Sequence, residues 1–264
     1  MSIFSNRLIV SANTQDELKT FLKSITNSNE FDLLEPNRFL LFDFNKITPM
    51  PEELKNTICS INIDCAIYYY IVKTNQEDSL KHILYNPNYH TMEHYKSFSQ
   101  EDLNKIFGIG KNYVELYHKY GYRDWCDWAT KNWGTKFNAY NTDVEYVDEC
   151  TAIITFKTMF AGVPNLIAKL VESYPALTFE YFYADEKIAH DCGKGWGEDG
   201  EFTFTKYTEN SYDAMNTFLI CWQDEASDYY LDENGIWHKH EWNDEDDWVD
   251  EDEYDDEDED ELCW

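Results

Sequence analysis

Length, composition and charge already exclude several kinds of protein. The chain has 264 residues, of which 52 are Asp or Glu and 21 are Lys or Arg, for a formal net charge of −31. Phosphate backbones and anionic membrane surfaces attract proteins through Lys and Arg, so we expect neither direct nucleic-acid binding nor membrane binding. Aromatic residues make up 17% of the chain, a load that disordered chains lack. The composition predicts a folded acidic protein whose partners are basic proteins, cations or none.

Targeting signals and cysteine spacing point to the cytoplasm. The first residues, MSIFSNRLIVSANTQDELK, contain no basic segment followed by an apolar stretch, so no signal peptide is predicted. No apolar run approaches the roughly 18 residues of a membrane-spanning helix. The seven cysteines are irregularly spaced and form no CxxC pair, which is unremarkable in a reducing compartment.

The N-terminal half is predicted to alternate strands with helical segments. After the first strand, Asn13 or Thr14 can cap a helix through TQDELKTFLKSI. Two prolines mark 48–57 as a turn that opens a short helix at Pro51. From about 76 to 121 the pattern is helical. Three runs are typical of strands: residues 7–12, 38–47 and 65–74.

The C-terminal half repeats a strand–helix–strand order. Residues 123–134 form an aromatic helix or turn, and a helix is predicted over 163–175. Residues 210–226 are a helix or a strand of undecided type. Glycine-rich AHDCGKGWGEDGE is predicted to be a flexible loop. The predicted strands are 151–160, 177–185 and 201–207, followed by a hairpin over 229–242. Together these elements predict an α+β fold, an antiparallel sheet with helices on one face.

Four motifs carry a resemblance to a known family. They are NRLIVSA near the start, FDFNKITPMPEEL (42–54), WCDWATKNWGTKFNAY (125–140) and the strand–helix–strand of 154–185. In order and spacing this combination resembles the YubB-type ferredoxin-like family of bacteriophages and conjugative plasmids, over roughly residues 6–210. Phe137 stands where that family more often has Trp. The resemblance implies a ferredoxin-like fold, a mobile-element origin, a bacterial host cytoplasm and no catalytic residue.

We therefore divide the chain into three parts. Residues 1–210 are predicted to form the ferredoxin-like domain, with a helical insert at about 76–121. Residues 211–240 form a hairpin-containing extension, and residues 241–264 form an acidic aromatic tail.

The tail is the strongest functional signal. From Glu241 onward, 16 of 24 residues are acidic and none is basic. A solubilising tail is the plain alternative, but exposed Trp is costly for mere solubility. Carboxylates with aromatic anchors match a groove built for nucleic acid, where phosphates and stacked bases bind. The predicted partner-binding residues are Trp242, Asp244, Glu245, Asp246, Asp247, Trp248, Asp250, Glu251, Asp252, Glu253, Tyr254, Asp255, Asp256 and Trp264.

Histidine pairs offer only weak metal signals. His90 and His94 spell HTMEH, the inverted zincin pattern, but they follow YNPNY, an unsuitable start for a long rigid helix. His238 and His240 share a strand face, which could hold a transition metal weakly but is better explained as a solvated surface. We predict no metal site and no cofactor.

Nucleophile and phosphate-loop motifs are equally weak. His190 and Cys192 are two residues apart on the predicted loop and have no orienting partner. FGIGK (107–111) lacks the spacing of a phosphate-binding loop. We therefore predict that the protein is not an enzyme.

Three functions from different classes remain. The favoured hypothesis is a mobile-element protein that inhibits a host nucleic-acid-binding defence enzyme, of the restriction or CRISPR type, by nucleic-acid mimicry. The alternative is a charge-based adaptor or chaperone for basic proteins of phage or plasmid DNA handling. An enzyme or metal-dependent factor is the least favoured.

Overall fold

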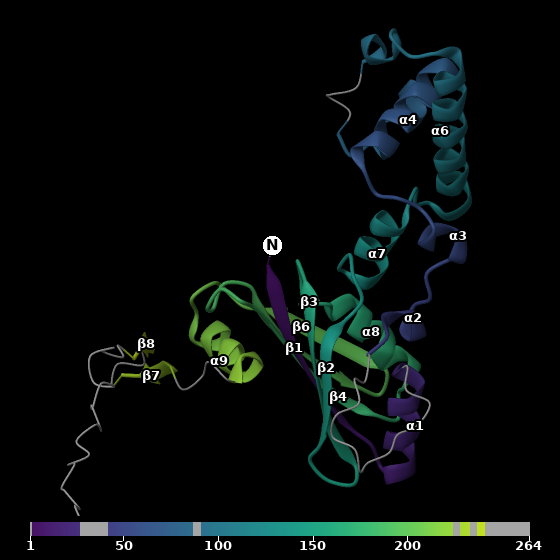
Figure 1. Cartoon of the computed structure of the whole chain (residues 1–264). Helices are drawn as coiled ribbons and strands as arrows, with labels where there is room; N and C mark the ends of the chain where they lie inside the picture. Colours follow the sequence, from purple (N-terminus) through teal and green to yellow (C-terminus); the bar gives the residue numbers. More distant parts are fainter. Residues whose placement is uncertain (1, 27–41, 87–90, 224–227, 233–236, 241–264) are drawn as a thin grey trace, which may run out of the picture.

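A six-stranded antiparallel sheet forms the centre of the protein. The computed structural model describes residues 2–26, 42–86, 91–223, 228–232 and 237–240 (Figure 1). The strand order is β2-β3-β1-β4-β5-β6. The central strand β1 (Ile3–Ser11) pairs with β3 (Thr151–Met159) on one side and β4 (Thr178–Asp185) on the other. The order β2-β3-β1-β4, with a helix after β1 and another after β3, is the ferredoxin-like arrangement. The predicted α+β fold is confirmed.

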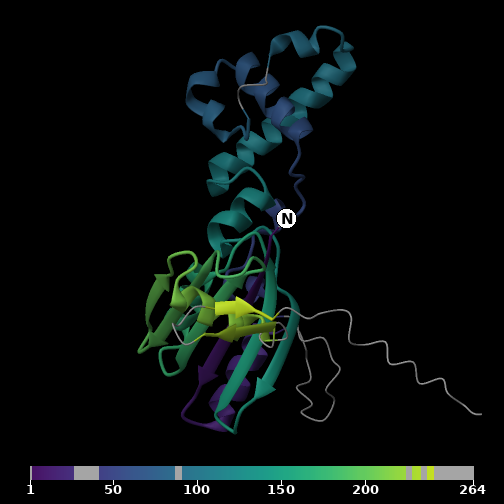
Figure 2. The same cartoon turned by 90° about the vertical axis from the view of Figure 1, so that its left-hand side faces the viewer.

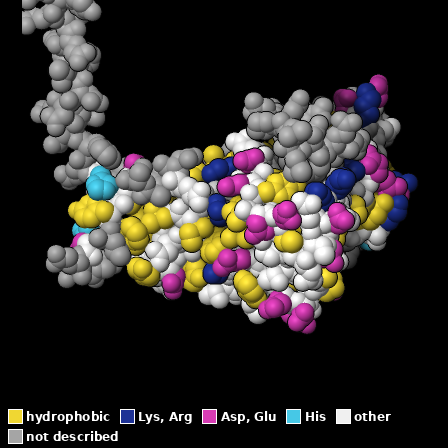
Figure 3. All heavy atoms as spheres, turned by 90° about the horizontal axis from the view of Figure 1, so that it is seen from below, with side chains coloured by type: hydrophobic (Ala, Val, Ile, Leu, Met, Phe, Trp, Pro, Cys, Tyr) yellow, Lys and Arg dark blue, Asp and Glu magenta, His cyan; other side chains and the backbone are white. Residues whose placement is uncertain are grey.

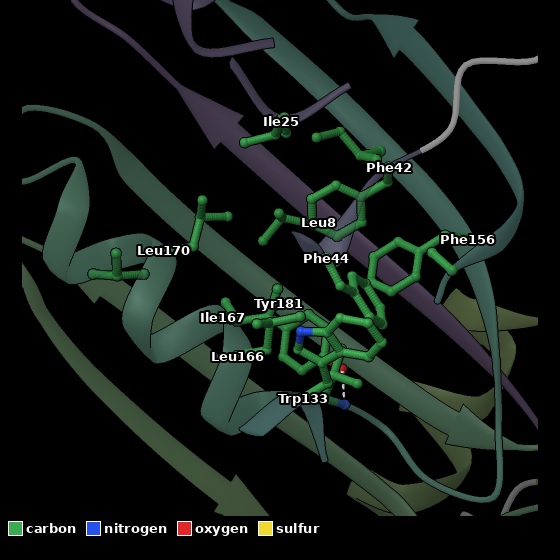
Figure 4. Packing of buried hydrophobic residues seen from close by; sticks show 14 of the residues in the cluster. Leu8, Ile25, Phe42, Phe44, Trp133, Phe156, Leu166, Ile167, Leu170 and Tyr181 are labelled. Carbon is green, nitrogen blue, oxygen red and sulfur yellow. Dashed lines mark hydrogen bonds between the residues drawn. The ribbon is translucent and has the colours of Figure 1, made fainter. Parts of the chain in front are cut away.

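Two helices cover one face of this sheet. Helix α1 (Gln15–Ile25) begins at Thr14, whose side chain accepts the Glu17 amide while the Glu17 side chain accepts the Thr14 amide. Helix α8 (Pro164–Ser173) begins with proline at its first turn. Their buried faces meet the sheet in the core seen in Figure 4. Both helices agree with the sequence prediction.

The opposite face carries a third helix, whereas the sequence analysis predicted helices on one face alone. Helix α9 (Tyr212–Cys221) lies on the other side of the sheet from α1 and α8 (Figure 1). The Ser5 hydroxyl donates to the Cys221 carbonyl across 2.6 Å, which fixes the helix end against β1. The undecided segment is thus a helix. The predicted hairpin is also present, as β7 (Tyr229–Leu231) and β8 (Trp237–Lys239).

The glycine-rich segment is a strand, so the predicted loop is wrong. β5 (Cys192–Glu198) pairs with β4 and with β6 (Glu201–Lys206). Its glycines face the side of the sheet that carries α1 and α8, and neighbouring side chains fill the space that a Cβ would occupy. A Cβ on Gly195 would lie 2.3 Å from the Phe202 ring, and one on Gly197 would lie 2.5 Å from Val171. Glycine here makes room for packing, a use that local propensity does not reveal.

Residues 61–120 are helical and have a core of their own, and we call them the helical unit. Helices α4 (Ile61–Lys73) and α6 (Gln100–Tyr120) pack together above the sheet (Figures 1 and 2). Shorter turns α5 (Glu77–Leu80), η1 (Lys81–Ile83) and η3 (Met92–Tyr95) complete it. The predicted strand over 65–74 is therefore wrong. The Ser60 side chain caps α4, and burial of its tyrosines and isoleucines between helices overrides their preference for strands.

Short helices connect this unit to the sheet. Helix α2 (Phe44–Ile47) begins at Asp43, whose carboxylate accepts the Asn45 amide. Residues 43–47 are thus not the end of a strand, as predicted for 38–47, and residues 27–41 lie outside the described residues. Helix α3 (Glu52–Lys55) follows Pro51 as predicted. On the return path, α7 (Trp125–Trp133) directs Trp128 and Trp133 into the sheet core.

A buried arginine joins the two cores. Arg123 is 1% exposed, and its Nη1 donates to Asp64 of α4 and to the Ile83 carbonyl, both across 2.6 Å. Its Nε donates to Asp124, the N-cap of α7, across 3.2 Å. The guanidinium also lies 3.3 Å from the centre of the Tyr85 ring. One side chain therefore contacts both the helical unit and the helix that enters the sheet core.

We expect Asp64→Asn to destabilise the fold by about 3–5 kcal/mol, because it leaves a buried guanidinium without its closest carboxylate. Urea unfolding at neutral pH measures the loss. The control is Asp78→Asn on exposed α5, which should change stability by less than about 0.5 kcal/mol. Equal stabilities for the two variants would contradict a joining role for Arg123.

A second prediction tests the close packing of α4 on α6. A Cβ on Gly110 would lie 2.1 Å from the Ala66 carbonyl oxygen, whereas one on Gly108 would meet nothing within 4 Å. Gly110→Ala should therefore cost about 1–3 kcal/mol through overpacking. Gly108→Ala should instead stabilise the helix by up to about 1 kcal/mol. Thermal unfolding of both variants should give shifts of opposite sign.

Candidate protein-binding surface

The predicted partner-binding residues lie outside the part of the chain that the structure describes. This applies to the whole acidic tail from Glu241, including Trp242, Trp248, Tyr254 and Trp264. Their role stays a prediction. The described residues nevertheless contain a second acidic surface that the sequence analysis did not find.

Carboxylates gather at the end of the sheet that lies away from the helical unit. We call this surface the acidic end. Figure 3, which views the molecule from below, shows Asp and Glu side chains spread over this face among apolar, Lys and Arg side chains. Eight exposed carboxylates define it: Asp16, Glu17, Asp148, Glu149, Glu172, Glu198, Asp199 and Glu201.

The sheet topology brings these residues together. The Ala12 amide donates to the Cys150 carbonyl across 2.9 Å, which places the β2–β3 turn beside the start of α1. A Cβ on Gly200 would lie 3.3 Å from Pro175, so the β5–β6 turn sits beside the chain that leaves α8. Residues from four separate segments thus share one end, where local sequence shows only scattered pairs of acids.

An apolar groove of about 400 Å³ opens within this end. Its walls include Phe21 of α1 and residues Tyr174 to Leu177, which link α8 to β4, and its rim carries Asp16 and Glu17. The Phe21 and Tyr174 rings meet edge to face with centroids 5.0 Å apart. Apolar walls with a carboxylate rim suit the long stem and charged head of Lys or Arg.

Some of these acids have local structural roles, but the juxtaposition of one pair does not stabilise the fold. Asp16 and Glu17 favour the N-terminus of α1, and Asp199 with Gly200 forms the positive-φ pair of a tight hairpin turn. Glu198 and Glu201, however, lie directly opposite each other across β5 and β6. Like charges in that position destabilise a sheet, so local folding does not account for this pair.

The helical unit and the segments that flank it are charged differently from the sheet. Together they span residues 52–122, which contain nine acids and seven bases. Six of the seven lysines pair with a glutamate, as in Lys119 with Glu53 at 2.7 Å and Lys105 with Glu101 at 2.8 Å. Near balance of charge leaves this unit little attraction for a basic surface. Excess negative charge therefore belongs to the tail and to residues 1–51 and 123–240, which we call the sheet domain.

The weak catalytic candidates take ordinary positions. The prediction that His190 has no orienting partner is wrong, because its Nδ1 lies 3.2 Å from the Asp185 carboxylate. Cys192 is buried on β5, and burial raises the pKa of its thiol to about 12, so the thiolate is scarce at neutral pH. These two residues do not form a nucleophile and base.

His94 and His238 likewise pack against aromatic rings. His94 belongs to a short 3₁₀ turn, and its former partner in the motif, His90, lies outside the described residues. His238 stacks on the Tyr230 ring and lies 3.0 Å from Asp232.

Glu201→Gln is predicted to raise the free energy of unfolding by about 0.2–1 kcal/mol, because it removes the repulsion opposite Glu198. The gain should shrink in 1 M salt, where the screening length falls to about 3 Å. Urea unfolding at low and high salt measures it. Glu149→Gln is the matched control at the same end of the sheet, and a gain as large there would refute the pairwise explanation.

A comparison with protein-family models agrees with this fold. A family model described as "Ferredoxin-like domain in Api92-like protein" matches residues 136–233. That segment runs from just before β2 to the last hairpin. No curated protein matches the chain. Among solved structures, a protein Api92 from Yersinia pseudotuberculosis is similar at 10% identity, with a TM-score of 0.34, over 79% of this chain and 98% of that chain.

Among the described residues, no helix is long and apolar enough to cross a membrane. The predicted YubB-type, phage or plasmid origin stays a prediction. The family match and the strand order agree on the fold: residues 136–233 are similar to the ferredoxin-like domain in Api92-like protein, and β1 completes the same sheet from outside the matched segment.

Proposed function

We propose that the protein is a mobile-element protein that binds the basic, nucleic-acid-binding surface of a host defence enzyme and inhibits it by mimicry. One observation carries this proposal: from Glu241 onward, 16 of 24 residues are acidic and none is basic. Carboxylates in that density replace phosphates on a surface of Lys and Arg, and the charge speeds association.

The acidic end supports the proposal from within the described fold. Its carboxylates project from turns and helix ends, and the groove between them fits a basic side chain. Residues 1–51 and 123–240 together hold 27 acids and 14 bases, so the sheet domain is acidic even without the tail. A partner that contacts both regions gains attraction from each.

The test compares four full or truncated chains under one salt series. They are the natural chain, a chain ending at His240, an acidic-end variant (Glu149→Gln, Glu198→Gln, Glu201→Gln) and a control variant (Glu93→Gln, Glu101→Gln, Glu115→Gln). Both triple variants remove three charges, but the control removes them from the balanced helical unit. Each immobilised chain is exposed to nuclease-treated bacterial lysate, and the captured enzyme is then purified and assayed for DNA binding.

We expect the natural chain to capture one nucleic-acid-binding enzyme. In the DNA-binding assay, the natural chain should displace a labelled DNA duplex from that enzyme. Ending the chain at His240 should weaken binding at least about tenfold, equal to about 1.4 kcal/mol. The acidic-end variant should weaken it more than the control does. Equal capture of many basic proteins, such as lysozyme and cytochrome c, would favour the charge-based adaptor instead. Undiminished inhibition by the shortened chain would contradict mimicry by the tail.

A further inference from the structure

Two thiols and a carboxylate meet where the helical unit joins the sheet domain. The side chains are Cys59, which precedes α4, and Asp124 and Cys126, which begin α7. Their ligand atoms all lie within 4.8 Å of one another. A search of the described residues for three or more His, Cys, Asp or Glu side chains close enough to share a metal ion finds this group.

The carboxylate is held in place and retains capacity for a further ligand. Asp124 accepts from the Asp127 amide at 2.9 Å, the Tyr85 hydroxyl at 2.9 Å and Arg123 Nε at 3.2 Å. A carboxylate offers about four lone-pair sites, so these three donors leave room for one more bond. Hydrogen bonds of this kind orient metal ligands in known sites.

The charge of the surroundings favours a cation. Arg123, Asp64 and Asp124 are all at most 2% exposed, and together they carry two negative charges and one positive charge. Buried charge is normally balanced by a partner or a metal. Cys59 is half-buried and Tyr85 is 49% exposed, so solvent reaches the group. A cavity of about 330 Å³, lined by Tyr85 and Asp127 among others, lies beside it.

We propose that Cys59, Asp124 and Cys126 bind one thiophilic divalent cation, Zn²⁺ by ligand type, at this junction. Two thiolates and one carboxylate are ligands that Zn²⁺ accepts in tetrahedral sites, with water as the fourth. The ligands come from both sides of the junction, so the ion adds a bond between the helical unit and α7. This inference does not depend on the proposed function.

Cobalt provides the test, because thiolate–Co²⁺ charge transfer gives absorption that oxygen ligands do not. The full chain is reduced, its free thiols are counted, and Co²⁺ is added in excess Mg²⁺ so that the acidic tail is already occupied. We expect a band that saturates at one Co²⁺ per chain and is displaced by one Zn²⁺. Zn²⁺ at 100 times its Kd should also raise the unfolding midpoint by about 5 °C or more.

Cys59→Ser is the principal variant, since this half-buried loop position tolerates a smaller polar side chain. It should lose the cobalt band and the midpoint rise while keeping the midpoint of the metal-free protein. Cys150→Ser, in the distant β2–β3 turn, should retain both. A fully reduced natural chain without the band, or an equal band in Cys59→Ser, would overturn the proposal. A Cys59–Cys126 disulfide that forms under air, with no metal uptake once it is reduced, would do the same.

Discussion

The buried guanidinium of Arg123 sets how the two halves of the molecule meet. It lies between Asp64, which belongs to the helical unit, and Asp124, which starts the helix that enters the sheet core. Replacing such a buried ion pair with apolar residues is often neutral or stabilising, so the pair need not add net stability. Its geometry is nevertheless specific. A guanidinium stacked on Tyr85 and bonded to two carboxylates and a carbonyl fits one arrangement of those four groups.

A second buried polar chain fixes the sheet core. The Val163 amide donates to the Tyr181 hydroxyl, which donates to Asn6, and Asn6 in turn donates to Thr158 at 2.9 Å. These groups link the central strand to its neighbours β3 and β4 and to the start of α8. A one-residue slip of β1 would move Asn6 to the other face and leave the tyrosine hydroxyl without its acceptor. Register is therefore specified by hydrogen bonds as well as by the apolar pattern.

The sequence predicted the elements that local interactions stabilise. Its predictions were wrong for elements whose conformation depends on contacts with residues far away in the chain. Thr14 and Pro164 mark their helices with side chains that act within one turn, so α1 and α8 were predicted correctly. Segment 65–74 has the composition of a strand, but its buried side chains pack between helices, where Ala66 meets Gly110 across 44 positions of sequence. β5 was missed because the side chains that cover its glycines belong to other strands and to α8.

The same reasoning explains what was missed in the candidate surfaces. The acidic tail is contiguous, so composition reveals it. The acidic end is assembled from four segments at turns and helix ends, and it becomes visible only when the sheet places Asp148, Glu172 and Glu198 at one end of its strands. Cys59 and Cys126 are 67 positions apart and obey no motif spacing. They meet because α6 returns the chain to α7, beside the start of α4.

Screening determines how such separated charges can act. At physiological salt the screening length is about 8 Å, so exposed carboxylates at the acidic end attract only the parts of a partner that come almost into contact. The near-neutral helical unit adds little to that attraction, and it lies at the opposite end of the molecule (Figure 1). A basic partner drawn by charge would therefore approach the sheet domain and leave the helical unit clear. That geometry leaves the helical unit free for a contact that depends on shape rather than on charge.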